Sequence, residues 1–215
     1  MKIIEIIFII LTMSLGTSSC MMSRRTINAS KEIEVREYHL SPVSNINAST
    51  DVIIIISPGY TKNTITVKGS KNVLDALVLK DNGNGRLSVS LDHGGRFNYR
   101  SENQKAHVYI TSNQITHLIC SSGAKIDVTD TIRCQDHFIM ETMTGGSISF
   151  NGVISPAINA KAFTGGSIIL QGIISEILNA QAFTGGFISI SGETKALHTK
   201  GNEYLLDVDK LQIIN

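Results

Sequence analysis

The sequence predicts an all-β protein built as a parallel β-helix, because one short segment recurs at a fixed spacing and alternates in hydrophobicity. Thr144–Ile148 reads Thr-Gly-Gly-Ser-Ile, and the run returns at Thr164 and, with Phe in place of Ser, at Thr184. The spacing is 20 residues, and the first two copies are identical at 12 of 20 positions. Repetition at a short fixed period is the signature of a solenoid, in which each copy forms one coil. We therefore predict stacked coils of about 20 residues.

Each copy contains two predicted strands that meet at a glycine-rich corner. In the first copy, Ile148 and Phe150 alternate with polar residues, which is the period of a half-buried strand. A second strand is expected over 157–163. Helix is disfavoured, because each glycine costs about 1 kcal/mol in a helix interior, whereas Ile and Thr favour strands. Glycine suits a corner whose backbone must reach positive φ. The predicted structural corner residues are Gly123, Thr144, Gly145, Gly146, Thr164, Gly165, Gly166, Thr184, Gly185 and Gly186.

Stacked coils place like residues above one another at a spacing of about 4.8 Å. Asn159 should therefore lie beside Asn179 as part of an amide ladder. Small residues at the inward positions imply a narrow coil without an internal cavity, so that any ligand would bind outside. These inward positions are Ala160, Ala162, Ala180 and Ala182.

Two phenylalanines are expected to point away from the alanine positions. Phe163 and Phe183 occupy the same place in successive copies, and Met143 precedes them in the column. They would form either an apolar surface strip for a partner or a packed corner. The corner is favoured, since large aromatic side chains are usually mostly buried.

The segment before the repeats is predicted to contain further strands. Glu32–Tyr38 alternates weakly and is expected to be the first strand of the folded part. Val52–Ile56 is a continuous aliphatic run, which fits a strand buried on both faces. Thr64–Lys68 alternates and is expected to be its partner strand.

A strong turn signal and two irregular coils complete the predicted order. Asp81–Gly85 reads Asp-Asn-Gly-Asn-Gly and should join a strand ending at Leu79 to one beginning at Leu87. The coil that starts at Ser122 is two residues longer than the others, and the insertion is expected near 133–136.

The last part of the chain is expected to close the solenoid. After Gly192 the apolar pattern gives way to polar residues, as the end of a solenoid facing water requires. Tyr204–Ile214 alternates again and should be a closing strand or cap.

Residues 92–106 are predicted to form a long exposed loop. Arg96, Phe97, Tyr99 and Arg100 make a compact basic and aromatic cluster within it. A glycan or protein ligand could bind on the sheet face or at this loop, or the loop could be solvated with a local hydrophobic anchor. We favour the anchor, because loops are variable as well as functional.

The N-terminus has the pattern of an export signal. Ile3–Leu15 is an apolar run behind Lys2, too short to span a membrane, and small residues precede Cys20. The expectation is a signal peptide over 1–20 with a lipoprotein-type cleavage site, and a flexible tether over 21–34. Cys20 would become the mature N-terminus and carry the lipid, making the protein an outer-membrane lipoprotein on the surface or periplasmic side. The alternatives are an ordinary secretory peptide or a retained membrane anchor.

The repeated corners also carry a resemblance to a known family. Thr144–Ile148, its two copies and the corner Ser121–Ala124 resemble the small-residue corners of the head GIN domain family. This is a family of proposed adhesins of unknown function, many of them Bacteroidetes-type lipoproteins. The resemblance covers about residues 35–215. It implies a right-handed, pectin-lyase-like β-helix without that superfamily's catalytic residues, and a role in cell adhesion.

The sequence contains no recognisable catalytic or metal-binding pattern, and no cofactor is expected. The six histidines share no metal-ligand spacing with one another or with the cysteines. Asp127 and Asp130 are spaced so that they would lie on opposite faces of a strand. Cys120 and Cys134 could be bridged after export, although two free core thiols are favoured. The histidines are His39, His93, His107, His117, His137 and His198.

Composition narrows the possible partners. A formal net charge of +1 with 17% charged residues gives no basic face for nucleic acid.

We expect a non-enzymatic, lipid-anchored cell-envelope protein that acts as an adhesin or binding module. The alternatives are a polysaccharide-active lyase or hydrolase on the same fold, and a structural envelope protein that forms homo-oligomers through Phe163 and Phe183.

Overall fold

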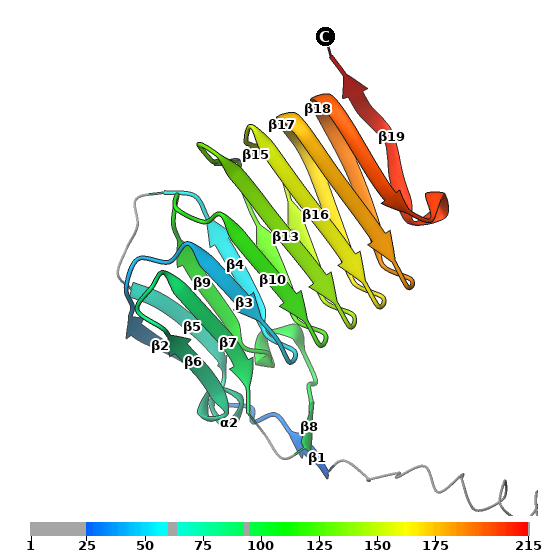
Figure 1. The fold of residues 1–215 in the computed structure, drawn as a ribbon. Helices are drawn as coiled ribbons and strands as arrows, with labels where there is room; N and C mark the ends of the chain where they lie inside the picture. Colours follow the sequence, from blue (N-terminus) through cyan, green and yellow to red (C-terminus); the bar gives the residue numbers. More distant parts are fainter. Residues whose placement is uncertain (1–24, 60–63, 93–94, 215) are drawn as a thin grey trace, which may run out of the picture.

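The computed structural model describes residues 25–59, 64–92 and 95–214. It is nearly all β and forms a β-solenoid of about five turns, with coils of about 20 residues, as the sequence predicts (Figure 1). The elements in chain order are β1 (Arg25–Asn28), β2 (Ile33–His39), β3 (Asn45–Ala48), β4 (Ile53–Ser57), β5 (Thr64–Ser70), α2 (Lys71–Asp75), β6 (Leu77–Asp81), β7 (Arg86–Leu91), β8 (Gly95–Asn98), η1 (Glu102–Gln104), β9 (His107–Thr111), β10 (His117–Ser121), β11 (Lys125–Val128), β12 (Ile132–Arg133), β13 (His137–Met143), β14 (Ser147–Phe150), β15 (Val153–Ile154), β16 (Ala157–Phe163), β17 (Ser167–Phe183), β18 (Phe187–Gly201), η2 (Glu203–Leu205) and β19 (Leu206–Ile213).

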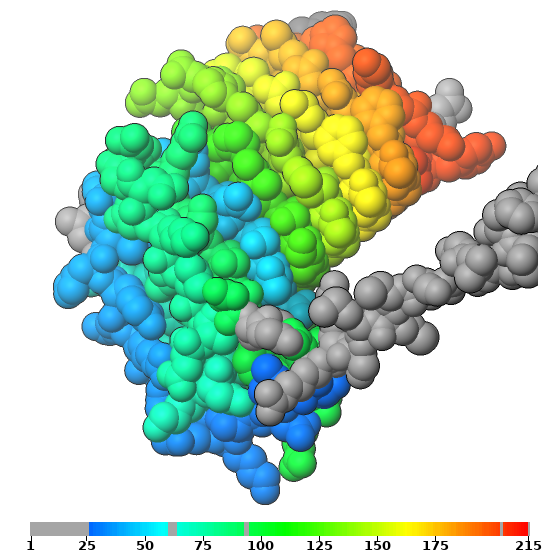
Figure 2. Space-filling view, turned by 60° about the horizontal axis from the view of Figure 1, so that its bottom comes forward, coloured from blue at the N-terminus to red at the C-terminus, as the bar shows by residue number. Residues whose placement is uncertain are grey.

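Successive repeats stack in parallel register, which confirms the central expectation. Ile148 is the partner of Ile168, and Ile168 is the partner of Ile188. All three side chains are buried, so the hydrophobic half of each alternating strand fills the interior. In the space-filling view the coils appear as adjacent bands of colour from green to orange (Figure 2).

The strands form two main walls that face each other across a narrow core. One wall contains β7, β3, β10, β13 and β16 as parallel neighbours, followed by the second halves of β17 and β18. The other contains β9, β4, β11 and β14, followed by the first halves of β17 and β18. The predicted inward alanines, Ala160, Ala162, Ala180 and Ala182, are all fully buried.

The order of rungs differs from the order of the chain. The coil of β3 and β4 lies between β7 and β9 on one side and β10 and β11 on the other. Thr64–Lys68 is therefore not the partner of Val52–Ile56, as the sequence suggests. Instead β5 pairs antiparallel with β2 and β9, while β4 pairs in parallel with β9 and β11. The predicted turn at 81–85 does join an antiparallel pair, β6 and β7.

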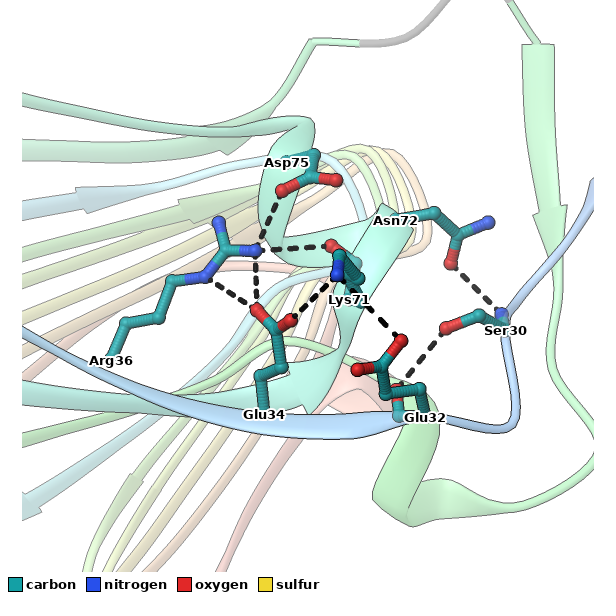
Figure 3. Close-up of polar contacts among 7 residues, drawn as sticks. All are labelled: Ser30, Glu32, Glu34, Arg36, Lys71, Asn72 and Asp75. Carbon is teal, nitrogen blue, oxygen red and sulfur yellow. Dashed lines mark hydrogen bonds and ion pairs between the residues drawn. The ribbon is translucent and has the colours of Figure 1, made fainter.

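A network of charged side chains lies between β2 and α2 (Figure 3). Arg36 contacts Glu34 and Asp75, each at 2.6 Å, and so joins β2 to α2. Lys71 lies 3.4 Å from Glu34 and 3.7 Å from Glu32. The hydrogen bond from Arg36 holds the pKa of Glu34 below its usual value, while the charge of Glu32 raises the pKa of Lys71. The network lies on the side of β2 that also carries the buried Val67 of β5, whereas the exposed side of β2 carries Ile33 and Val35.

Strand β1 lies inside the segment that the sequence predicts as a flexible tether over 21–34. It pairs in parallel with β8, and Ala29 just after it is buried. Residues 25–34 therefore contain one strand and the beginning of a second, where the sequence predicts a flexible tether. The predicted signal peptide over 1–20 and the lipidation site Cys20 lie outside the described residues.

The predicted loop over 92–106 is more ordered than expected. It contains β8 and the short helix η1, and Phe97 is buried in the core. Gln104, also buried, donates a hydrogen bond to the carbonyl of Ser30 at 2.9 Å. The local hydrophobic anchor is thus present, but the segment is packed against β1 rather than solvated.

The other end of the described chain is closed by β19, which pairs in parallel with β18 as expected. The two extra residues of the coil that starts at Ser122 lie at two separate places. Val128 pairs with Phe150, Ile132 with Val153 and His137 with Ala157, so that the offset falls by one residue at each step. One extra residue lies between Val128 and Ile132, and the other lies between Arg133 and His137.

Candidate functional site

The repeated corners form a column of tight turns along one side of the solenoid (Figure 1). In the second copy, the amide of Gly166 donates a hydrogen bond to the carbonyl of Phe163 at 2.9 Å. Thr164 has φ of 50° and Gly165 has φ of 74°. Positive φ at both central residues is the pattern of a type I′ turn. Ser122, Thr144 and Thr184 repeat the geometry, each followed by a glycine with positive φ.

The two glycines of each corner have different roles, which corrects the expectation that the pair serves positive φ. Gly165 has positive φ and open space where a Cβ would lie. Gly166 does not have positive φ, but a Cβ there would lie 2.6 Å from the Oγ1 atom of Thr142 in the preceding coil. The first glycine therefore relieves backbone strain, whereas the second allows the coils to approach.

The first coil departs from the glycine pattern at its corner. Ala48 pairs with Cys120 and Ile53 with Lys125, so Thr50 and Asp51 occupy the places of Ser122 and Gly123. Both have positive φ, of 62° and 57°. Asp51 thus puts a carboxylate where the other coils have a bare backbone, and its Oδ1 lies 2.8 Å from the place a Cβ of Gly123 would take.

A depression lies between this corner column and the segment that contains β8 and η1. It has a volume of about 330 Å³ and continues, across Asp51 and Arg96, into a wider one of about 750 Å³. Both signs of charge line it. The charged and aromatic lining residues are Asp51, Arg96, Phe97, Tyr99, Glu102, Lys105 and Lys125.

Two of the three cations in the depression already have partners. Lys105 lies 3.0 Å from Glu102 and over the ring of Tyr99, 6.0 Å from its centroid. Lys125 lies 2.8 Å from Asp127. Arg96 is exposed and forms no ion pair with any residue in the described ranges.

The hydroxyl of Tyr99 is buried and has no hydrogen-bond partner among the residues that the structure describes. Burial, and the nearby carboxylates of Asp51 and Glu102, raise the pKa of this hydroxyl. Tyr99 therefore remains a neutral group that can donate a hydrogen bond.

The structure brings together Arg96, Phe97 and Tyr99 from the predicted cluster but leaves Arg100 outside the depression. Sequence reasoning missed Asp51, Lys105 and Lys125. Thr50 and Asp51 could have been found only by aligning the first coil with the later corners, and their lack of glycine conceals that alignment.

The outer surface of one wall carries ladders of like side chains. The Nδ2 of Asn179 donates a hydrogen bond to Oδ1 of Asn159 at 2.8 Å, which confirms the predicted amide ladder. Phe163 and Phe183 stack with ring centroids 5.7 Å apart, and both are half-buried, while Met143 is exposed. They form a partly exposed strip beside the corners rather than a fully packed corner.

A second, smaller depression lies on the same wall near its N-terminal rungs. It has a volume of about 320 Å³ and includes Asn45, Arg86 and His117. The Nε2 atom of His117 is buried and has no hydrogen-bond partner in the described part of the chain. This burial lowers the pKa of His117, against the opposing charge of Glu141.

The two described cysteines are free thiols rather than a disulfide. The Sγ atom of Cys120 donates to the carbonyl of Ala124, and that of Cys134 donates to the carbonyl of Ile115. Burial raises the pKa of each thiol to about 11. Within the described ranges, no three His, Cys, Asp or Glu side chains are grouped so that they could hold a metal ion.

Asp127 and Asp130 do not share a strand, because β11 ends at Val128. Asp127 is half-buried and accepts a hydrogen bond from Ser149, whereas Asp130 is exposed in a bend. Among residues 25–59, 64–92 and 95–214, no helix is long and apolar enough to cross a membrane.

Comparison with known proteins finds one matching family and several solved structures with a similar fold. The family described as "Putative auto-transporter adhesin, head GIN domain" matches residues 44–204. A solved structure called a "Putative lipid binding protein", from Parabacteroides distasonis, is 15% identical with a TM-score of 0.72, over 88% of this chain and 78% of that one. A "putative adhesin" from Bacteroides fragilis is 14% identical with a TM-score of 0.54, over 82% of this chain and 96% of that one. Another "putative adhesin", from Parabacteroides merdae, is 11% identical with a TM-score of 0.56, over 88% and 95%. Among curated proteins, none matches the chain.

Proposed function

The chain belongs to the head GIN domain family of auto-transporter adhesin type, and on this premise we propose that it is a non-enzymatic binding module, an adhesin held at the cell envelope by a lipid on Cys20. The observation that carries the proposal is the depression at the corner column. There the solenoid presents the exposed Arg96, which has no ion-pair partner among the described residues, and the half-buried carboxylate of Asp51. The names of the related folds, which refer to adhesins and to lipid binding, agree with binding as the activity.

The carboxylates on the coil walls favour binding over polysaccharide cleavage. Glycoside hydrolysis commonly requires two carboxyl groups that flank one bond. Here Glu141 lies 3.1 Å from Lys161, and Glu176 lies 3.2 Å from Lys195. Each carboxylate is thus paired with a lysine of the next coil. Incubation with envelope and host polysaccharides should release no new reducing or unsaturated ends, and release of either would favour the enzyme instead.

The anchor is tested by mass spectrometry of the mature N-terminus. We expect a diacylglyceryl modification on Cys20, outer-membrane fractionation, and loss of both in Cys20→Ala. An unmodified N-terminus at another residue would contradict the anchor while leaving the binding role open.

The adhesin role is tested by deleting the gene and measuring attachment to host matrix and to glycan arrays. We expect attachment to fall, and to be restored by the wild-type chain. Unchanged attachment together with a blank array would contradict the adhesin. The adhesion ligand is a glycan or protein on the outer sheet face, with no nucleic acid expected. Self-association through Phe163 and Phe183 would be supported by sedimentation as a dimer that Phe163→Ser abolishes.

A further inference from the structure

Two opposite charges share the depression without neutralising each other. Asp51 and Arg96 both line its two parts, yet no ion pair joins them among the described residues. Nor does the side chain of Asp51 form a hydrogen bond with another described residue. A single anion would be attracted by Arg96 and repelled by Asp51, so the wall is complementary to a group that carries both signs.

The other charges of the depression are already paired. Lys105 lies 3.0 Å from Glu102, and Lys125 lies 2.8 Å from Asp127. Arg96 and Asp51 are therefore the open charges of this wall, and among the described residues the buried hydroxyl of Tyr99 also has no hydrogen-bond partner. Arginine and lysine are the usual partners of phosphate oxygens, and carboxylates are the usual partners of an ammonium group.

The position of the depression along the chain points to the source of such a group. Thr26 and Gly95 line its wider part, and Gly95 is the strand partner of Arg25. Cys20 is five residues before Arg25. An extended chain spans at most about 3.5 Å per residue, so a lipid on Cys20 would be within about 18 Å of Arg25. The depression would then lie close to the headgroups of the anchoring bilayer.

We propose that the depression at Asp51 and Arg96 binds the zwitterionic headgroup of a phosphoethanolamine lipid, with its phosphate on Arg96 and its ammonium on Asp51. The placement at the bilayer rests on the proposed lipid anchor, whereas the charge complementarity does not. Binding would hold the corner side of the solenoid toward the membrane and leave the opposite ends of its walls free for other contacts.

Soluble headgroups test the complementarity without the anchor. The full chain with Cys20→Ser, in a non-ionic detergent, is titrated calorimetrically with O-phosphoethanolamine, inorganic phosphate and ethanolamine. We expect O-phosphoethanolamine to bind about tenfold or more tightly than either fragment. Arg96→Ala and Asp51→Asn should each weaken it by about tenfold or more, the change expected when a charged contact is lost. Asn tolerates the positive φ of residue 51, so that this variant keeps the backbone.

Matched controls are Arg100→Ala and Asp130→Asn, which change exposed charges outside the depression and should leave binding unchanged. Absence of O-phosphoethanolamine binding, or equal loss in the control variants, would overturn the site. Tight binding of phosphate alone, without a contribution from Asp51, would overturn its zwitterionic character.

Nanodiscs distinguish the bilayer from a free headgroup. The wild-type chain is reconstituted with phosphatidylethanolamine or phosphatidylcholine at the same anionic fraction, and hydrogen exchange is measured over 95–98 and 122–124. We expect slower exchange with phosphatidylethanolamine, and no such difference in Arg96→Ala. Equal exchange in both lipids, with soluble headgroup binding intact, would overturn the bilayer as the source. Since the titration uses Cys20→Ser, failure of the anchor and failure of the site give different results.

Discussion

Asn179 donates its Nδ2 hydrogen to Oδ1 of Asn159, 2.8 Å away, in the neighbouring coil and at the equivalent position of the repeat. An amide can accept from one side and donate to the other, so identical residues can stack. Here the ladder has two members, because the next strand partners are Ile139 and His198. The contact forms only when the two copies are aligned without a shift, because a slip of one residue would turn the side chain to the opposite face.

The amide ladder should therefore show pairwise coupling. Asn179→Ala is expected to lower the free energy of unfolding by about 0.5–1.5 kcal/mol, the usual net value of one hydrogen bond. A double-mutant cycle with Asn159→Ala should give a coupling energy of at least about 0.5 kcal/mol. Urea denaturation of the four proteins measures it, and Gln171→Ala, at an exposed position in the first half of β17, is the control. Strict additivity would contradict the ladder.

The two corner glycines should respond differently to a methyl group. Gly165→Ala introduces only positive-φ strain, which costs about 1 kcal/mol. Gly166→Ala places a Cβ 2.6 Å from the Oγ1 and 2.7 Å from the backbone carbon of Thr142, so it must push the coils apart. We expect the second variant to cost more, by about 1–3 kcal/mol. Thermal or urea denaturation measures both, with Ser167→Ala as the control; equal costs would contradict the division of roles.

His117 should make stability depend on pH. Its pKa in the folded state is lowered from 6.5 by burial, so the unfolded chain binds the proton more readily. This contribution to stability is fully present above about pH 6.5 and is lost as the pH falls toward the lowered pKa. Glu34, whose pKa in the folded state lies below 4.5, affects stability only at more acidic pH. Between pH 7 and pH 5 the free energy of unfolding, measured by denaturation, should therefore fall less in His117→Gln than in the wild type. His198→Gln, at an exposed position, is expected to lose as much as the wild type.

The buried thiols should react slowly in the folded protein. Thiolate is the reactive form, and a pKa of about 11 leaves little of it at neutral pH for either Cys120 or Cys134. Peptide mapping after brief alkylation at pH 7.5 should find both unmodified when folded and both modified in urea. Cys134, which is only half-buried, should react before Cys120. Recovery of the two cysteines as one disulfide-linked peptide would contradict the free thiols.

How much of this fold follows from the sequence depends on whether a feature is repeated. The strands around Ile148, Ile168 and Ile188 follow from near-identity at a fixed spacing, and so do the amide ladder and the inward alanines. The order of rungs does not follow, because β5 and β9 have the same alternating pattern and nothing local tells which of them lies beside β4. The order is set by pairing between strands far apart in the sequence: β9 lies beside β4, and β5 pairs with the other edge of β9.

The candidate site was harder to predict than the fold. Arg96 and Tyr99 stand out in the sequence as a cluster, but Asp51 belongs to a corner whose glycine has been replaced. Its neighbourhood arises because β8 pairs with β1 from the predicted tether. That pairing involves four-residue strands of mixed polarity, which carry little periodic signal.

The stacking of the repeats is tested most directly by engineered disulfides on the outer face of β16 and β17. Lys161 and Gln181 are strand partners that both point outward, whereas Ala180, one residue earlier, faces the core. Lys161→Cys with Gln181→Cys should form a bridge under mild oxidation, because partner residues lie within disulfide reach. Lys161→Cys with Ala180→Cys should not. Peptide mapping that finds the first pair linked and the second unlinked is the predicted result, and the reverse pattern would contradict the stacked solenoid.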